Sequence, residues 1–374
     1  MRRGTAFVAL LLLAVMAPRG AAAGPALVVE LSNSKVLFAE DADALWHPAS
    51  LTKMMTAYLV FEALKAGKIT LKSKVTCSAA AHEQPPSKIG LAVGRQMSVN
   101  LALQSLIVKS ANDVAMMLAE TVGGSEAAFV EMMNAKARAL GMERTFFVNP
   151  NGLPAPAQVT TARDLAKLAR AVINDFPEYA HYWQKSEMRL GKQRLVTHNG
   201  LLQSFAGADG MKTGFTCDSG FNVVATATRD GRRVIAVVLG ENSSAERNIR
   251  AASLLEHGFH QTGWKQLFNS TTIDNMPLAP AVGVRSVRND VVSWGCSDRK
   301  AKVAKSKARK KKKDAVAAAK KKKKPAAKAA EPETVTVDVD RRDDAAQGDD
   351  AAPATVQLRG TMPPPAAAAF QSQH

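Results

Sequence analysis

The chain has 374 residues, enough for one large domain or two ordinary ones, and a formal net charge of +17. Residues 299–328 carry a local charge of +15 and residues 331–350 a local charge of −6, whereas residues 24–298 sum to only about +4. The basic character therefore belongs to a C-terminal tail and not to the folded part, and no stretch after the first 23 residues is long and apolar enough to span a bilayer.

The N-terminus has the organisation of a secretory signal peptide. Arg2 and Arg3 precede an apolar run from Thr5 to Ala17, and small residues follow up to Ala23. The apolar run is shorter than the roughly 20 residues that span a bilayer. We therefore expect residues 1–23 to be a signal peptide cleaved after Ala23, with an uncleaved anchor as the alternative. Export predicts a periplasmic protein and excludes nucleic acid as a partner of the basic tail.

The first elements after the signal peptide are predicted to be a hairpin and a helix. Two β-rich runs flank Asn33-Ser34, which favours a turn there. Pro48 suits the first turn of a helix, apolar residues recur at positions 51, 54, 55, 58 and 59, and Gly67 marks the stop. From Leu71 to about Ala206 the pattern is mostly helical.

The pattern then changes from helices to strands. Three consecutive strands are expected within residues 207–240, with Asp230-Gly231 as a hairpin turn, followed by a helix from Ser243 to near Gly258. This order predicts an α+β fold in which one antiparallel sheet is built from both chain ends and a helical insertion lies between them. We expect residues 24–264 to form the domain, 265–298 a short extension or linker, and 299–374 a disordered low-complexity tail.

Three cysteines allow one disulfide and one free thiol in an exported protein, and the sequence does not choose the pair among Cys77, Cys217 and Cys296. Cys77 and His82 do not form a metal site, because no second pair of ligands accompanies them. We expect Cys77 and Cys217 to be small buried or half-buried residues. No metal or organic cofactor is predicted.

Three short motifs follow one another along the chain: S-x-x-K at Ser50–Lys53, S-x-N at Ser110–Asn112 and K-T-G at Lys212–Gly214. Residues i and i+3 of a helix share a face, so the first motif places a hydroxyl beside an amine, as a nucleophile and its base require. Taken singly, the motifs have structural alternatives: a helix-start serine with a solvated lysine, a helix cap, and an ordinary strand threonine. In this order, however, they are typical of penicillin-binding proteins and class A β-lactamases.

The residues around these motifs carry a closer likeness. The segments PASLTKMMTA, VKSANDVAMMLAE, FVNPNGLP and DGMKTGFTCDSGFNVVATA resemble the low-molecular-mass D-alanyl-D-alanine carboxypeptidases, which are serine peptidases among the penicillin-binding proteins. The resemblance covers roughly residues 26–263. It implies a five-stranded antiparallel sheet with helices on both faces and a helical subdomain that carries the S-x-N loop. It also implies peptidoglycan stem peptides as substrates and β-lactams as covalent inhibitors.

The resemblance implies that Ser50 is acylated after Lys53 takes its proton. An ordinary lysine, with a pKa of about 10.4, is charged at neutral pH, so Lys53 needs burial and a nearby cation such as Lys212 to become a base. Ser110 would relay a proton to the leaving D-Ala amine. Asn112 would hold Lys53 and the substrate amide.

The third motif would bind the substrate. Lys212 and Thr213 are expected to hold the terminal carboxylate, and Gly214 to let the peptide lie against the strand. By analogy with the family, the backbone N–H groups of Ser50 and Phe215 form the oxyanion hole. His198 lies about where some members carry an arginine that helps bind the carboxylate; the alternative is a surface loop residue.

We therefore expect a penicillin-sensitive carboxypeptidase that removes the terminal D-Ala from peptidoglycan pentapeptides. The alternatives are a DD-endopeptidase acting on cross-links and a non-catalytic β-lactam-binding wall module. A β-lactamase is disfavoured, because no acidic residue takes the place of the glutamate that class A enzymes use for deacylation.

The C-terminus departs from the family. Several relatives continue into a second, all-β domain and an amphipathic anchoring helix, but the segment after Trp264 is too short for such a domain and the tail is not amphipathic. The basic run is expected either to lie on anionic lipid or acidic wall polymer, at roughly 1 kcal/mol per basic residue, or to stay solvated without a dedicated partner.

Overall fold

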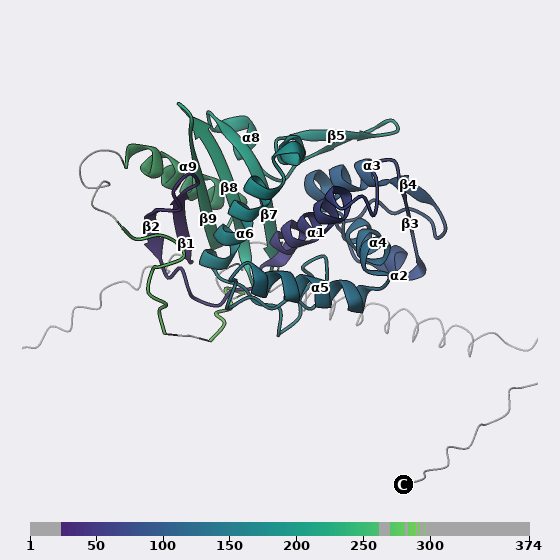
Figure 1. Ribbon diagram of the computed structural model, residues 1–374, viewed down its shortest axis with the longest axis horizontal. Helices are drawn as coiled ribbons and strands as arrows, with labels where there is room; N and C mark the ends of the chain where they lie inside the picture. Colours follow the sequence, from purple (N-terminus) through teal and green to yellow (C-terminus); the bar gives the residue numbers. More distant parts are fainter. Residues whose placement is uncertain (1–23, 262–269, 281–282, 289–290, 292–295, 297–374) are drawn as a thin grey trace, which may run out of the picture. The chain divides into compact units, whose positions relative to one another are not determined.

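The computed structural model contains a five-stranded antiparallel sheet, in the order β2-β1-β9-β8-β7, beside a mostly helical part (Figure 1). The structure describes residues 24–261, 270–280, 283–288, 291 and 296, all within one compact unit. The expected signal peptide and low-complexity tail lie outside these residues.

The sheet is built from both ends of the domain, as predicted. The N-terminal hairpin supplies β1 (Ala26–Glu30) and β2 (Val36–Glu40). The C-terminal part supplies β7 (Ala208–Thr216), β8 (Gly220–Arg229) and β9 (Arg232–Glu241), and β9 pairs with β1. The turn between β8 and β9 is at Asp230-Gly231, where both residues have positive φ, as this hairpin type requires.

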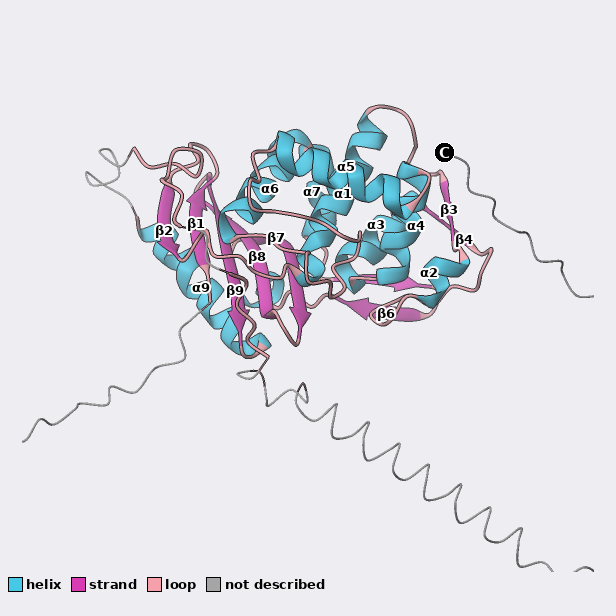
Figure 2. Cartoon of the chain, turned by 90° about the horizontal axis from the view of Figure 1, so that it is seen from below, coloured by secondary structure: helices cyan, strands magenta, loops and turns pink. Residues whose placement is uncertain are grey.

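Helices cover both faces of the sheet (Figures 1 and 2). Alternate side chains of each strand point to opposite faces. Val28 and Ala236 pack with Leu255 of α9 (Ser244–His260) on one face. Leu27 and Val237 belong to the larger core on the other face, which contains α1 (Lys53–Lys65) and α6 (Ala162–Asp175). α9 is capped by the Ser243 side chain, as predicted, and ends two residues beyond the expected Gly258.

The insertion between β2 and β7 is mostly helical, as expected. Besides α1 and α6 it contains α2 (Ala79–Glu83), α3 (Val99–Gln104), the π-helix η2 (Ser105–Lys109), α4 (Asn112–Gly123), α5 (Glu126–Ala139), the 3₁₀ turn η3 (Pro177–Tyr179), α7 (Ala180–Trp183) and α8 (Leu201–Ser204).

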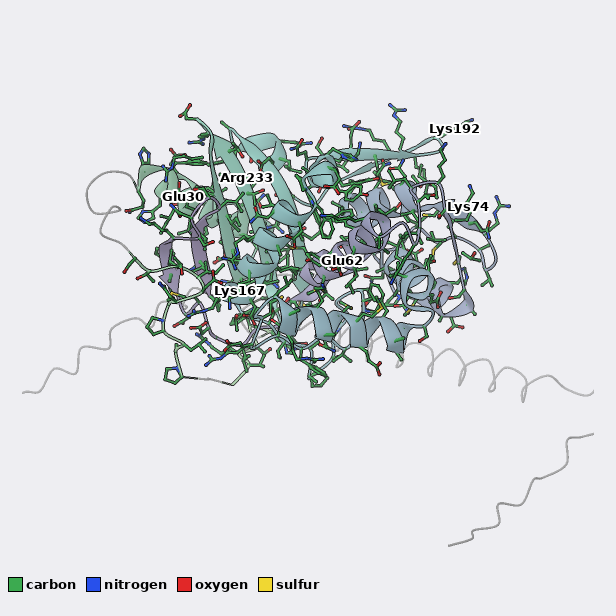
Figure 3. All side chains as sticks on the ribbon, in the orientation of Figure 1. Glu30, Glu62, Lys74, Lys167, Lys192 and Arg233 are labelled. Carbon is green, nitrogen blue, oxygen red and sulfur yellow. A yellow bond between two sulfur atoms is a disulfide. The ribbon has the colours of Figure 1, made fainter. Side chains whose placement is uncertain are left out.

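Two small two-stranded sheets interrupt these helices and were not predicted. They are formed by β3 (Lys74–Thr76) with β4 (Gln96–Ser98), and by β5 (Glu187–Leu190) with β6 (Gln193–Val196). Figure 3 labels Lys74 on the first and Lys192 at the turn of the second. Strands of three or four residues are too short to show a clear alternating pattern.

The helix that follows β2 begins differently from the prediction. A 3₁₀ turn, η1 (Ala49–Thr52), comes first, with Pro48 at its N-cap, and the α-helix starts only at Lys53. Ser50 therefore lies in the 3₁₀ turn. α1 ends at Lys65, and Gly67 follows with φ +68°, in agreement with the expected stop.

The described residues after α9 pack along the domain. Arg163, in α6, pairs with Asp43 and donates hydrogen bonds to the carbonyls of Met276 and Pro277. Cys217 and Cys296 form a disulfide, so Cys217 is half-buried as expected but is also bonded; Cys77 is a buried free thiol. Within the described part of the chain, no helix is long and apolar enough to cross a membrane.

Candidate active site

Ser50 and Lys53 are in contact at the junction of η1 and α1. The Lys53 Nζ atom lies 3.0 Å from Ser50 Oγ, 2.8 Å from Asn112 Oδ1 and 2.5 Å from the carbonyl oxygen of Asn151. The Lys53 side chain is only 1% exposed, so the alternative of a solvated charge is wrong. The junction therefore holds the amine in one position, directed at the serine hydroxyl.

The surroundings of Lys53 disfavour its charged form. Burial is the largest cause that lowers its pKa well below the ordinary value, and the positive charge of Lys212 lowers it further, while Asp113 acts in the opposite direction. Because the neutral amine carries a lone pair, Lys53 can accept a proton from Ser50. The site thus contains a serine next to a base.

The S-x-N motif reaches the same site from the turn between η2 and α4. Ser110 adopts a left-handed conformation, with φ 59° and ψ 38°, and accepts a hydrogen bond of 2.9 Å from Lys212 Nζ. α4 begins at Asn112, its N-cap is Ala111, and no side chain caps it. The helix-cap alternative for this motif is therefore wrong. A strained backbone conformation at a polar residue is typical of functional sites.

The K-T-G motif lies on β7, which is an edge strand: among the described residues it pairs in the sheet with β8 alone. Thr213 lies in that strand, with its side chain at the cleft. Gly214 packs against η1: a Cβ atom there would lie 2.9 Å from the Pro48 carbonyl oxygen and 3.0 Å from the Ser50 amide nitrogen. Only glycine lets the strand come this close to the nucleophile, and Phe215 follows next to it.

Ser50, Ser110, Asn112, Thr213 and Gly214 line one cleft of about 490 Å³ between β7 and the helical part, together with His198 and Arg247. Lys53 and Lys212 are buried behind the wall of the cleft and contact its Ser50 and Ser110. Burial and then the charge of Arg247 lower the pKa of Lys212 to about 7. Burial, followed by Lys212 and two further cations, lowers the pKa of His198 to about 4, so this imidazole is neutral at pH 7. The Lys212 end of the cleft is therefore electropositive and suits an anionic group.

Sequence reasoning missed Arg247. It comes from the first turn of α9, is 3% exposed and donates a hydrogen bond of 3.1 Å to the backbone carbonyl of His198. Burial lowers the pKa of Arg247 to about 10, which still leaves it charged at pH 7. The sequence carries one weak indication of its role. A cation in the first turn of a helix interacts unfavourably with the helix dipole, so an arginine at this position indicates a role other than stabilising the helix.

Asn151 was also missed, although the segment FVNPNGLP that contains it carried part of the resemblance. Its backbone carbonyl accepts the hydrogen bond from Lys53, and its side chain donates to Gln84. Any residue can supply a backbone carbonyl, so a sequence motif does not reveal this contact.

Comparisons with known proteins agree with this arrangement. Residues 13–243 match the family model described as D-alanyl-D-alanine carboxypeptidase. The chain is 40% identical to the D-alanyl-D-alanine carboxypeptidase DacC of Escherichia coli (strain K12) over 240 residues, which cover 62% of this chain and 60% of that protein. It therefore spans about three fifths of the length of that curated relative.

Solved structures give the same likeness. Penicillin-binding protein 5 from Haemophilus influenzae superposes with a TM-score of 0.62 and 36% identity, over 65% of this chain and 72% of the other. The cefotaxime-bound penicillin-binding protein D2 from Listeria monocytogenes superposes with a TM-score of 0.58 and 34% identity, over 63% of this chain and 97% of the other.

Proposed function

The chain belongs to the D-alanyl-D-alanine carboxypeptidase family, and from this premise we propose that it removes the terminal D-Ala from peptidoglycan stem pentapeptides through an acyl-enzyme on Ser50. One observation carries the proposal: a buried lysine of lowered pKa lies 3.0 Å from the hydroxyl of a serine at the wall of a cleft. Serine is a weak nucleophile unless a base takes its proton.

In the acylation step, neutral Lys53 takes the proton of Ser50 as the Oγ atom attacks the carbonyl carbon of the penultimate D-Ala. The carbonyl oxygen becomes an oxyanion, which the backbone N–H groups of Ser50 and Phe215 stabilise. The close approach of Gly214 to the Ser50 amide supports this placement, because it brings the edge of β7 beside η1.

The leaving group then receives a proton. Collapse of the tetrahedral intermediate breaks the C–N bond, and Ser110 relays to the D-Ala nitrogen the proton that Lys53 took from Ser50, which returns Lys53 to its neutral form. The hydrogen bond between Lys212 and Ser110 supports this role, because a cation next to the hydroxyl helps it release its proton. Asn112 contacts Lys53 and lines the cleft, where its amide also meets the substrate. Water hydrolyses the ester and regenerates Ser50.

The electropositive end of the cleft recognises the free C-terminus. Lys212, Thr213 and Arg247 bind the terminal carboxylate: Thr213 and Arg247 line the cleft, and Lys212 is hydrogen-bonded to Ser110 in its wall. Arg247 is held in place by its hydrogen bond to the backbone carbonyl of His198. A carboxylate bound by charged, buried donors makes strong hydrogen bonds. This arrangement supports a carboxypeptidase, whose substrate ends at the residue it releases.

The same nucleophile makes β-lactams covalent inhibitors, and the cefotaxime complex of the Listeria protein supports this part of the proposal. The protein acts in the periplasm, which rests on the signal-peptide pattern of residues 1–23. Its basic run, residues 299–328, lies on anionic lipid or wall polymer; the concentration of charge outside the domain supports this. Cosedimentation with anionic vesicles or wall fragments at increasing salt concentration tests whether residues 299–328 bind these surfaces.

The test of the function is release of free D-Ala from a peptide ending in D-Ala-D-Ala, by the protein and by its Ser50→Ala variant. We expect release by the first alone, with both proteins equally stable. Cleavage of cross-linked dimeric muropeptides without D-Ala release would instead assign an endopeptidase. Covalent labelling by penicillin with no hydrolysis of either substrate would assign a binding module.

A further inference from the structure

A second cavity, of about 280 Å³, adjoins the cleft beside the nucleophile turn. It shares Gly152, Leu153 and Thr216 with the cleft, so the two are direct neighbours. The residues that line it do not include Lys212, His198 or Arg247. The cavity therefore lies beyond the catalytic serine, away from the electropositive end.

The direction of β7 relates this cavity to the substrate. If the carboxylate is held at Thr213 and the reacting carbonyl at Phe215, the amino side of the peptide continues toward Thr216, at about 3.3 Å per residue along the strand. Thr216 and Asp218 form one wall of the cavity. Resting on the proposed function, we propose that this cavity is a subsite for the side chain of the residue before D-Ala-D-Ala, and that it takes an uncharged aliphatic segment.

The lining of the cavity explains the aliphatic preference. Most of it is apolar, from Pro48, Ala49 and the loop from Leu153 to Pro156. The Asp218 carboxylate is neutralised by two hydrogen bonds of 2.7 Å from Arg288. A charged substrate side chain would therefore find no free counter-charge at Asp218. An aliphatic side chain, in contrast, gains roughly fourfold in binding constant for each methylene group that it removes from water.

Further polar groups at the cavity already have partners within the protein. Thr216 Oγ1 donates a hydrogen bond to Ser219 Oγ at 2.9 Å. His47 Nδ1 donates to the backbone carbonyl of Gln158, also at 2.9 Å. The cavity thus offers mostly apolar contact, which is typical of a pocket for a hydrocarbon group.

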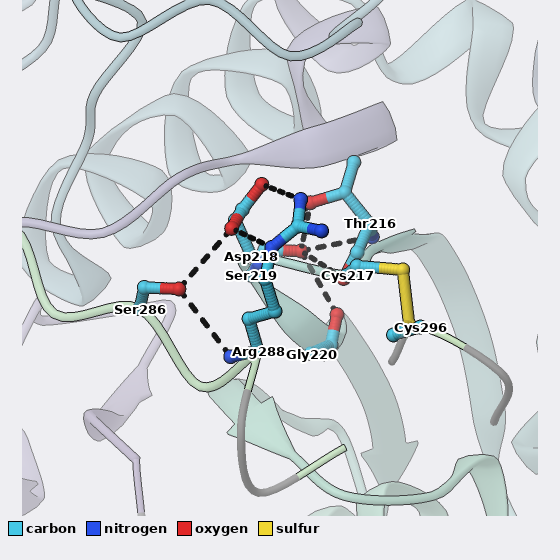
Figure 4. Close-up of a disulfide and its surroundings, with 8 residues drawn as sticks. All are labelled: Thr216, Cys217, Asp218, Ser219, Gly220, Ser286, Arg288 and Cys296. Atoms are coloured by element: carbon cyan, nitrogen blue, oxygen red, sulfur yellow. Dashed lines mark hydrogen bonds and ion pairs between the residues drawn. A yellow bond between two sulfur atoms is a disulfide. The ribbon is translucent and has the colours of Figure 1, made fainter. Parts of the chain in front are cut away.

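The wall on the β7–β8 side is held from outside by the C-terminal segment (Figure 4). Cys217, at the start of the turn, is bonded to Cys296, and Arg288 is paired with Asp218. Trp46 donates a further hydrogen bond of 2.9 Å to the Ser219 carbonyl. These links fix the turn that carries Thr216 and Asp218.

The opposite wall is equally fixed. Gln158 Oε1 accepts hydrogen bonds from the amides of Val148 and Asn149, and its amide group donates to Leu153. Gly152 has φ +85°, and a Cβ atom there would lie 1.9 Å from the Ala49 carbonyl oxygen. Because both walls are tied down, the subsite is formed before the substrate arrives.

The test uses acetylated tripeptides ending in D-Ala-D-Ala, in which the first residue is glycine, alanine, norvaline or norleucine. We expect kcat/KM to rise along this series by roughly fourfold per buried methylene. Ala155→Trp fills the cavity and should make kcat/KM nearly independent of the length of this side chain. Ala157→Trp is the matched control: it is an exposed residue of the same loop, outside the lining, and should leave the series unchanged.

A parallel series separates this subsite from the proposed function. Penicillins with straight acyl chains of increasing length acylate Ser50 without any need for peptide hydrolysis. If no peptide loses D-Ala but acylation still rises with chain length, and Ala155→Trp abolishes the rise, the function fails and the subsite stands. Rates independent of chain length in both series, an unaltered series in Ala155→Trp, or absence of both reactions would overturn the subsite.

Discussion

Lys53 lies 3.0 Å from the Ser50 hydroxyl while its own side chain is 1% exposed. The contact and the burial have one structural origin: α1 starts at Lys53 and is buried on almost every side, so the amine cannot reach solvent. Asn112 and the Asn151 carbonyl then fix its direction. The fold thus lowers the pKa of Lys53, and the proposed reaction requires this amine to be neutral so that it can take the Ser50 proton.

The two lysines of the cleft predict a bell-shaped dependence of kcat/KM on pH for D-Ala release. Below the lowered pKa of Lys53 the amine is protonated and cannot take the Ser50 proton, so activity falls in acid. Above about pH 7 free Lys212 loses its charge, because burial and Arg247 lower its pKa to about 7, and carboxylate binding weakens. A substrate with a C-terminal carboxamide should show a shallower alkaline limb, because it loses only the contribution that Lys212 makes through Ser110. The same alkaline limb for both substrates would contradict this assignment.

Gly214→Ala should reduce kcat/KM by about 100-fold without unfolding the protein. The added methyl group would lie 2.9 Å from the Pro48 carbonyl oxygen and 3.0 Å from the Ser50 amide, so β7 and η1 must move apart. A displacement of about 1 Å at reacting groups costs on the order of 100-fold in rate. Steady-state kinetics and circular dichroism measure the two effects. Gly283→Ala, where a Cβ atom meets nothing within 4 Å, is the control, and equal rates in both variants would refute the steric argument.

Arg247→Ala should raise KM for peptides with a free carboxylate by roughly 10-fold or more, in line with the loss of a charged hydrogen bond. The effect on kcat should be smaller, because Arg247 lies at the anion end and not at Ser50. The carboxamide substrate should show no such rise. Ile249→Ala, two residues along the same helix and 69% exposed, serves as control. A loss of kcat with unchanged KM would argue against carboxylate binding.

The sheet could be predicted because its strands are long or are marked by strong turns. Asp230-Gly231 defined the β8–β9 hairpin, and the three strands of β7 to β9 have nine or ten residues each. The short strands β3 to β6 could not be predicted, because pairing in three- and four-residue segments depends on partners distant in the chain.

The site shows the same division between local and distant information. Ser50, Ser110 and Lys212 were predicted from short motifs; the structure brings the two serines to one cleft and places Lys212 in contact with Ser110. Arg247 enters that cleft from α9, so only the packing of this helix on the sheet reveals it. The Cys217–Cys296 pair joins residues 79 positions apart, and no local pattern distinguishes it from the other two pairings.

Arg163→Met should destabilise the protein by roughly 3–5 kcal/mol at pH 7, because it leaves the Asp43 carboxylate buried without its partner. The two side chains are 3% and 4% exposed. Burial raises the pKa of Asp43, but hydrogen bonds from Arg163 and the Ala279 amide, together with nearby positive charge, bring it below 3.8.

The pH dependence of that loss gives the test. A lowered folded pKa means that Asp43 contributes stability above its unfolded value of 3.8, and that this contribution is lost as pH falls through the folded pKa. The difference between the protein and Arg163→Met should therefore shrink between pH 7 and pH 3, as measured by urea denaturation. Arg170→Met removes a more exposed pair with Asp274 and should cost less than about 1 kcal/mol. Equal losses in the two variants would contradict the argument.

The Cys217–Cys296 disulfide should stabilise the domain and also sharpen the choice of acyl side chain. It closes a loop of 79 residues, for which loop-closure entropy predicts roughly 4.5 kcal/mol, and it anchors the turn that follows Thr216. A dithiol reductant, itself oxidised to a disulfide as the two thiols form, should lower the urea midpoint of the protein. The double variant Cys217→Ser, Cys296→Ser should start at that lower midpoint and not respond to reductant.

Because Lys53 and Ser110 contact neither cysteine, Ser50 should still be acylated in the double variant, but the acylation rate should depend less on the length of the acyl chain. An undiminished chain-length dependence in the double variant would show that the turn holds its shape without the bond.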